Sequence, residues 1–87
     1  MEYWGVLVTD INHYLEKAIQ ETQFLNHGEI FLLRDLFKGY EWNRISRSNR
    51  LLLGTLFLNR VSSENLEVKI NAKASSGQQK YQIAREF

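Results

Sequence analysis

The spacing of apolar residues changes once along this chain, and that change limits the class of fold. In most of the chain up to Val61, apolar side chains recur three and four residues apart, as in helices that bury one face. From Leu66 onward they alternate with polar residues, as in strands that bury one face. The sequence therefore predicts an α+β domain with its helices first and its main strands last.

Two long helices are expected. Residues 10–23 place their apolar side chains on one face, and Thr9 or Asp10 can cap the first turn. Residues 50–61 repeat this spacing after the segment 46–49, which offers two serine hydroxyls as caps. Both helices are predicted to pack against one shared core.

Shorter elements are expected between these helices. Gly28 is predicted to take a positive φ and reverse the chain, and residues 29–33 are typical of a short strand. Residues 35–45 are predicted to form a short helical segment that Asp35 caps and Gly39 weakens or ends. The chain order is then helix, short strand, helix, helix.

The last third of the chain is predicted to form a β-hairpin. Residues 66–73 and 80–84 alternate in polarity, and the polar segment 74–79 between them is typical of a turn. The aromatic residues expected in the core are Phe31, Phe37, Trp42 and Phe57, with Tyr81 half-buried on the hairpin.

This order of elements is that of a winged helix-turn-helix, in which the hairpin is the wing. All 87 residues are assigned to one domain, with residues 1–9 as an N-terminal extension and residues 10–87 as the winged-helix core. The chain has no cysteine and no apolar run long enough to cross a membrane. We therefore expect a cytoplasmic protein without disulfides.

The net charge of +1 hides an asymmetry between the two parts of the chain. Residues 1–37 contain two basic and six acidic residues, a net charge of −4. Residues 38–87 contain nine basic and four acidic residues, a net charge of +5. Such an asymmetry indicates contact with nucleic acid, so duplex DNA is the predicted partner.

In a winged helix, the start of the third helix and the wing are the parts that contact DNA. Arginine can bind phosphate or guanine, asparagine suits adenine, and serine suits phosphate. The serines also have a simpler role as helix caps, and the lysines as a solvated strand surface. The candidate DNA-binding residues are Arg44, Ser46, Arg47, Ser48, Asn49 and Arg50 near the third helix, and Lys69, Lys73, Ser75, Ser76, Gln78 and Lys80 on the hairpin.

The third helix is also apolar around more than one face, which is unusual for a helix that reads DNA. Leu51 and Leu58 either pack under the wing or form a surface for a partner, to which Trp4 can contribute. The alternative prediction is therefore a non-enzymatic interaction module, an adaptor or inhibitor, or a homodimer.

Catalysis, metal binding and cofactor binding are not expected. His13 and His27 are 14 residues apart and lack the spacing of metal ligands. The serine pairs have no surrounding glycine elbow, and no glycine-rich loop suited to phosphate is present in the sequence.

A set of mostly apolar residues carries a family resemblance. Residues 31–37 end in Asp-Leu-Phe, and Trp42, then residues 53–57 and Val61, follow. This pattern, over roughly residues 29–83, resembles an uncharacterised family of short bacterial and phage proteins, a domain of unknown function. The resemblance implies a winged-helix-like fold and a bacterial or phage setting, but no activity. Within it, Gly54 is explained by close approach of another backbone. Together with the charge pattern, it leads us to expect a transcriptional regulator or a phage or plasmid accessory factor.

Overall fold

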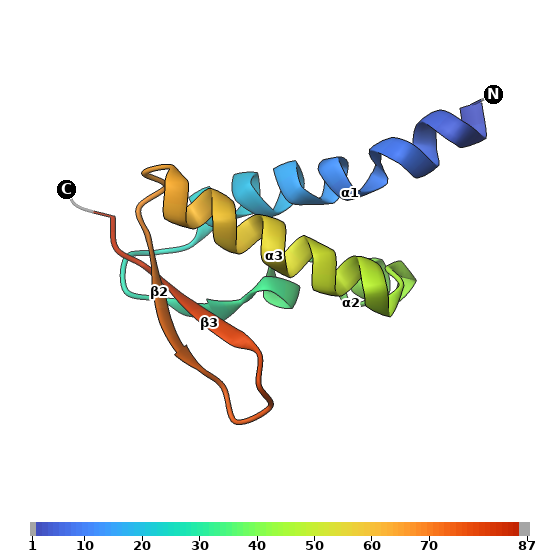
Figure 1. Cartoon of the computed structure of the whole chain (residues 1–87). Coiled ribbons are helices and arrows are strands. Elements are labelled where there is room, and N and C mark those ends of the chain that lie inside the picture. The colour runs from blue at the N-terminus through green and yellow to red at the C-terminus, as the bar shows by residue number, and fades with distance from the viewer. Residues whose placement is uncertain (1, 86–87) are drawn as a thin grey trace.

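The structure, a computed structural model, describes residues 2–85, with side chains described from residue 11 onward. Its described part contains α-helices and a three-stranded antiparallel sheet, which confirms the α+β class (Figure 1). In chain order the elements are α1 (Glu2–Glu21), the 3-10 helix η1 (Thr22–Phe24), β1 (Ile30–Leu32), the 3-10 helix η2 (Leu33–Leu36), α2 (Gly39–Arg44), α3 (Arg47–Ser63), β2 (Val68–Lys73) and β3 (Gln79–Ile83).

Helix α1 is longer than the sequence predicted. It begins at Glu2, so the predicted start near residue 10 is wrong, and Thr9 and Asp10 lie inside the helix instead of capping it. The segment 1–9, expected to be an extension, continues this helix from Glu2 onward. After η1 the chain reverses at Gly28, whose φ of +89° is the positive value predicted for it.

The segment between β1 and α3 differs from the prediction in its helix boundaries. Asp35 is not the residue before a helix, as predicted, but lies within η2. Its carboxylate accepts a hydrogen bond of 2.9 Å from the backbone N–H of Leu32. Helix α2 begins at Gly39, so this glycine opens the helix and does not end it. The Glu41 carboxylate accepts a 2.9 Å hydrogen bond from the Lys38 N–H and so occupies one of the free donors at the start of α2.

Helices α1 and α3 lie side by side over the sheet (Figure 1). An ion pair joins them: Arg60 Nη1 of α3 donates to Glu16 Oε2 of α1 at 3.0 Å. Arg60 also lies 2.9 Å from the Glu64 carboxylate. Its hydrogen bond with Glu16 raises the pKa of Arg60 above its ordinary value, and the charges of both glutamates add to this. Arg60 is therefore committed to helix packing.

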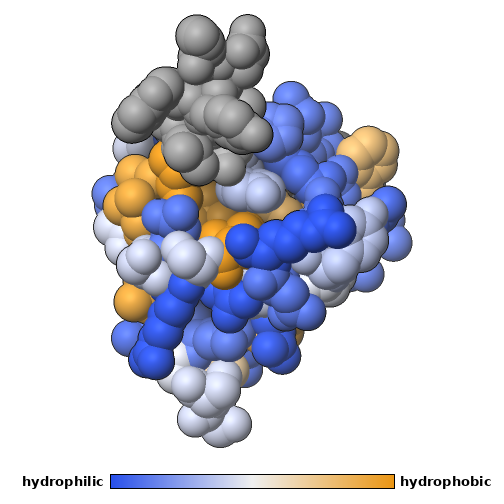
Figure 2. All heavy atoms as spheres, turned by 90° about the vertical axis from the view of Figure 1, so that its right-hand side faces the viewer, coloured by the Kyte–Doolittle hydropathy of each residue, from blue (hydrophilic) through white to orange (hydrophobic). Residues whose placement is uncertain are grey.

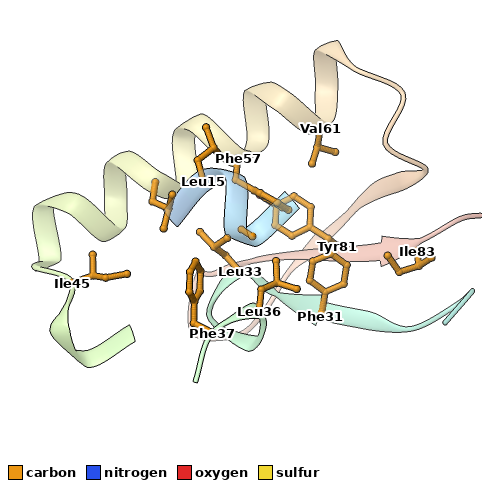
Figure 3. Packing of buried hydrophobic residues seen from close by; sticks show 12 residues of the cluster. Leu15, Phe31, Leu33, Leu36, Phe37, Ile45, Phe57, Val61, Tyr81 and Ile83 are labelled. Carbon is orange, nitrogen blue, oxygen red and sulfur yellow. The ribbon is translucent and has the colours of Figure 1, made fainter. Parts of the chain in front are cut away.

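Three aromatic rings connect α3 to the sheet (Figure 3). Phe57 meets Tyr81 edge-on, with ring centres 5.0 Å apart, and Tyr81 stacks on Phe31 at 5.6 Å. Tyr81 is only 2% exposed, so the predicted half-burial is wrong, and this burial raises the pKa of its phenol. Phe31, Phe37 and Phe57 are buried as predicted, whereas Trp42 is half-buried and packs against the core from outside.

The strand order in the sheet is β1-β3-β2, so β3 is the central strand. Ile70 of β2 pairs with Tyr81, and three residues later Lys73 pairs with Gln79. Between these pairs, two residues of β2 oppose one residue of β3, which is a β-bulge. Because paired residues share a face of the sheet, the bulge turns Lys73 to the face of Tyr81.

The exposure of the residues in β2 also differs from the predicted alternation over residues 66–73. Strict alternation would bury Val68, Ile70 and Ala72, but Ile70 is 46% exposed and Ala72 is exposed. The regular strand begins at Val68, after Glu67 with its positive φ of 60°. β2 is an edge strand, and its contribution to the core is therefore small.

Candidate nucleic-acid interface

A groove of about 420 Å³ lies between α3 and the hairpin formed by β2 and β3. Four basic side chains line it: Arg47 and Arg50 from α3, Lys73 from β2, and Arg34 from η2. Among the described residues that line the groove there is no carboxylate. The groove is therefore a site of positive potential, suited to an anionic ligand.

The start of α3 is set by Ser46. Its hydroxyl accepts a 3.3 Å hydrogen bond from the backbone N–H of Asn49, which confirms it as the helix cap. The helix begins at Arg47 and not near residue 50, so Ser48 lies within the first turn, with its hydroxyl 3.4 Å from that of Ser46. Arg47, Ser48 and Asn49 are exposed there, and of these Arg47 lines the groove.

Arg50 is partly used inside the molecule. Its Nε donates a 3.2 Å hydrogen bond to the backbone carbonyl of Trp42, and its guanidinium lies 5.3 Å from the centre of the Trp42 ring. Because the side chain is half-buried, only part of its donor set faces the groove. Arg44 is not brought to the groove at all: its guanidinium lies 5.0 Å from the ring of Tyr40.

The hairpin residues divide between two faces of the sheet. Lys73 and Gln78 line the groove, and Ser75 and Ser76 are exposed at the turn beyond it. Lys80 adjoins the buried Tyr81, so alternation places it on the opposite face of the sheet. Lys69 pairs with Gln82 on that same opposite face. Lys69 and Lys80 are therefore not brought together with the other candidates.

The leucines predicted to bind a partner lie at the same groove. Leu51 lines it and is 67% exposed, whereas Leu58 lines it and is half-buried. Leu52, which sequence reasoning did not select, is 47% exposed. Figure 2 shows an apolar area among hydrophilic side chains on the side of the molecule where α2 and α3 begin. The side chain of Trp4 lies outside the described residues.

Arg34 and Thr55 are among the groove residues that the sequence reasoning missed. Arg34 lies in the acidic part of the chain and 13 residues before Arg47, so nothing in the local pattern connects them. Thr55 follows Leu51 by one helical turn, a spacing that could have indicated a shared face.

Gly54 lies in the wall of the groove with open space beside it. Apart from its chain neighbours and the nearby backbone of α3 itself, no atom lies within 4 Å of the position that a Cβ would occupy, so the predicted close approach of another backbone is wrong for the described chain. The glycine leaves the backbone of α3 uncovered at the groove.

In the part of the chain that the structure describes, no three His, Asp or Glu residues are grouped as metal ligands would be. Within residues 2–85, no helix is both long enough and apolar enough to cross a membrane.

Comparison with known proteins places the chain in a family. No curated protein and no solved structure matches it. A family model described as a domain of unknown function (DUF1413) matches residues 16–82. This range begins earlier than the pattern over residues 29–83 and includes the end of α1, which packs on α3. The match covers most of the chain, which therefore belongs to the DUF1413 family.

Proposed function

We propose that this domain is a small DNA-binding protein of the winged-helix type, acting as a transcriptional regulator or accessory factor. One observation carries the proposal: Arg47 of α3 and Lys73 of the hairpin line one groove that has no carboxylate among its described lining residues. These residues are 26 positions apart in the sequence, so the fold brings them together.

The dimensions of the elements suit duplex DNA. A helix such as α3 fits the major groove, and a hairpin beside it reaches the adjacent minor groove or backbone. The groove between them would then receive one DNA strand, with its phosphates between Arg47 and Lys73 and the edges of its bases towards α3. The pairing of β1 with β3 supports this assignment, since the short first strand of a winged helix pairs with the wing hairpin.

The composition of α3 supports the same proposal. The helix contains three arginines and neither aspartate nor glutamate over Arg47–Ser63. Arginines in a first helical turn are unfavourable for the helix dipole, so helix stability does not explain why Arg47 and Arg50 are there. An anionic partner supplies one.

Gly54 gives independent support. A glycine in a helix interior costs about 1 kcal/mol relative to alanine, and no neighbouring atom within the described chain requires it. Glycine is favoured where a ligand approaches the backbone closely. A phosphate or sugar in the groove would make such an approach.

The test is fluorescence anisotropy of a labelled random-sequence duplex, titrated with the protein at several salt concentrations. We expect affinity to fall steeply as salt rises, because each neutralised phosphate releases counterions. The double variant Arg47→Ala/Lys73→Ala should bind more weakly, and its salt slope should decrease by about two, one for each lost phosphate contact.

A matched control removes the same charge elsewhere. Arg60→Ala/Lys69→Ala also takes one arginine from α3 and one lysine from β2, but Arg60 pairs with Glu16 and Lys69 faces away from the groove. Equal loss of affinity in both double variants would show a general charge effect and reject this site. Absence of duplex binding by the unchanged protein at low salt would reject the function.

A second candidate function is protein interaction, as an adaptor, an inhibitor or a homodimer. The exposure of Leu51, which is 67% at the groove, favours it, because exposed apolar surface often marks a binding site. Light scattering behind size exclusion measures the mass of the unchanged protein and of Leu51→Lys. If the unchanged protein is a dimer and Leu51→Lys is a monomer, the protein-interaction candidate is supported. If both proteins are monomers, the homodimer is excluded.

A further inference from the structure

We infer that α3 recognises thymine, by contact of Leu51 and Thr55 with the ring methyl group of that base. The inference rests on the proposed DNA-binding function and adds which base the site selects. It also accounts for apolar side chains on a helix that is otherwise suited to a polyanion.

Leu51 is the most exposed leucine on α3 that lines the groove. Its side chain is 67% exposed, so it does not pack under the hairpin. One turn later, the Thr55 hydroxyl donates a 3.2 Å hydrogen bond to the Leu51 carbonyl. The hydroxyl proton is therefore used within the helix, and the methyl group of Thr55 is available for apolar contact. Leu51 and Thr55 thus form one small apolar surface.

This apolar surface lies among cations. Arg47 precedes Leu51 by one helical turn, and both line the groove with Arg34 and Lys73. The charges complement a polyanion, so the occupant has phosphates beside the cations and an apolar group beside Leu51. Duplex DNA meets this requirement at thymine, whose methyl group projects into the major groove. None of the other three unmodified bases carries a methyl group there.

The geometry separates Leu51 from its neighbour. Leu52 lies four residues before Leu56 and eight before Arg60, so the three share one row along α3. This row faces α1, since Arg60 contacts Glu16 there. Leu51 lies in the row that faces the groove. Leu52→Ala is therefore a matched control for Leu51→Ala, since both remove an exposed leucine side chain from the same helix.

The experiment begins with selection of bound duplexes from a random-sequence library and measurement of their affinity by anisotropy. Each thymine of the selected duplex is then replaced by deoxyuridine, which removes only the methyl group. We expect about fourfold weaker binding for each methyl group that Leu51 or Thr55 covers. Replacing the critical adenine-thymine pair by guanine paired with 5-methylcytosine, which restores a methyl group there, should bind better than the same pair with unmethylated cytosine.

The variants complete the test. For Leu51→Ala the affinities for the thymine and deoxyuridine duplexes should become nearly equal, whereas Leu52→Ala should keep the difference shown by the unchanged protein. Circular dichroism melts check that both variants fold. Equal binding of both duplexes by the unchanged protein would overturn thymine recognition and leave DNA binding intact. If no duplex is recovered or bound, the proposed function fails, and this inference fails with it.

Discussion

Arg50 donates a hydrogen bond from its Nε to the backbone carbonyl of Trp42, 3.2 Å away. The same guanidinium lies 5.3 Å from the centre of the Trp42 ring. These two contacts join the first turn of α3 to α2 and keep the indole against the core. Arg50 therefore stabilises the fold as well as lining the groove, whereas the nearby Arg47 is exposed.

Substitution of Arg50 should therefore reduce stability. A hydrogen bond of this kind contributes about 1 kcal/mol and a cation-π contact about 0.5–1 kcal/mol, so Arg50→Ala should lower the free energy of unfolding by about 1–2 kcal/mol. Urea denaturation followed by Trp fluorescence measures this change. Arg47→Ala removes an exposed arginine from the same turn and should leave stability nearly unchanged. Equal losses in the two variants would contradict the structural role of Arg50.

Gly54→Ala should have opposite effects on stability and binding. Alanine in mid-helix is favoured over glycine by about 0.5–1 kcal/mol, and the open space beside Gly54 accepts the added methyl group. The melting temperature should therefore rise. Affinity for duplex DNA should fall, because the methyl group projects into the groove where the ligand approaches. A variant that gains stability and keeps full affinity would remove Gly54 from the binding surface.

Alkaline pH should destabilise the fold through Tyr81. Burial raises the pKa of this phenol above its ordinary value of 10.0, so the folded state holds the proton more tightly than the unfolded state. The stabilisation is complete below the unfolded pKa and is lost as pH rises through the folded pKa. Urea denaturation at increasing pH should show this loss, and Tyr81→Phe should reduce it. An unchanged pH profile in the phenylalanine variant would show that another group is responsible.

Phe57 should be among the most sensitive positions of the core. Its side chain is fully buried and contacts Tyr81, which in turn stacks on Phe31. Phe57→Ala should cost about 3–5 kcal/mol, a large part of the stability of a domain this size. Thermal unfolding measured by circular dichroism checks this value. A loss below about 1 kcal/mol would mean that the three-ring contact is not central to stability.

The sequence predicted what depends on local spacing. The Ser46 cap, the long α3 and the positive φ of Gly28 all follow from residue types and spacings within short segments of the sequence. The start of α1 was wrong because Thr9 and Asp10 are good caps, but neither prevents a helix from continuing through it. A cap preference is weak compared with the contacts that a longer helix can make.

The candidate site was predictable only in part. Arg47 and Lys73 were found because basic residues at a helix start and on a hairpin are visible in the sequence. Lys69 and Lys80 carry the same charge, and their separation from Lys73 depends on the register of β2 against β3. That register includes a bulge, and alternation of polarity cannot indicate an extra residue in a strand. Arg34 joins the groove only through tertiary packing.

The bulge in β2 has a consequence for how copies of this protein meet. An exposed edge strand can pair with the edge of another molecule and begin aggregation, most readily when it is long and regular. Here one edge strand, β1, has three residues, and the other, β2, is interrupted between Ile70 and Lys73. The irregular β2 edge also carries the charge of Lys69 and Lys73 beside the exposed Ile70. The extra residue of the bulge, which turns Lys73 toward the groove, thus also hinders β2 from pairing with a strand of a neighbouring molecule.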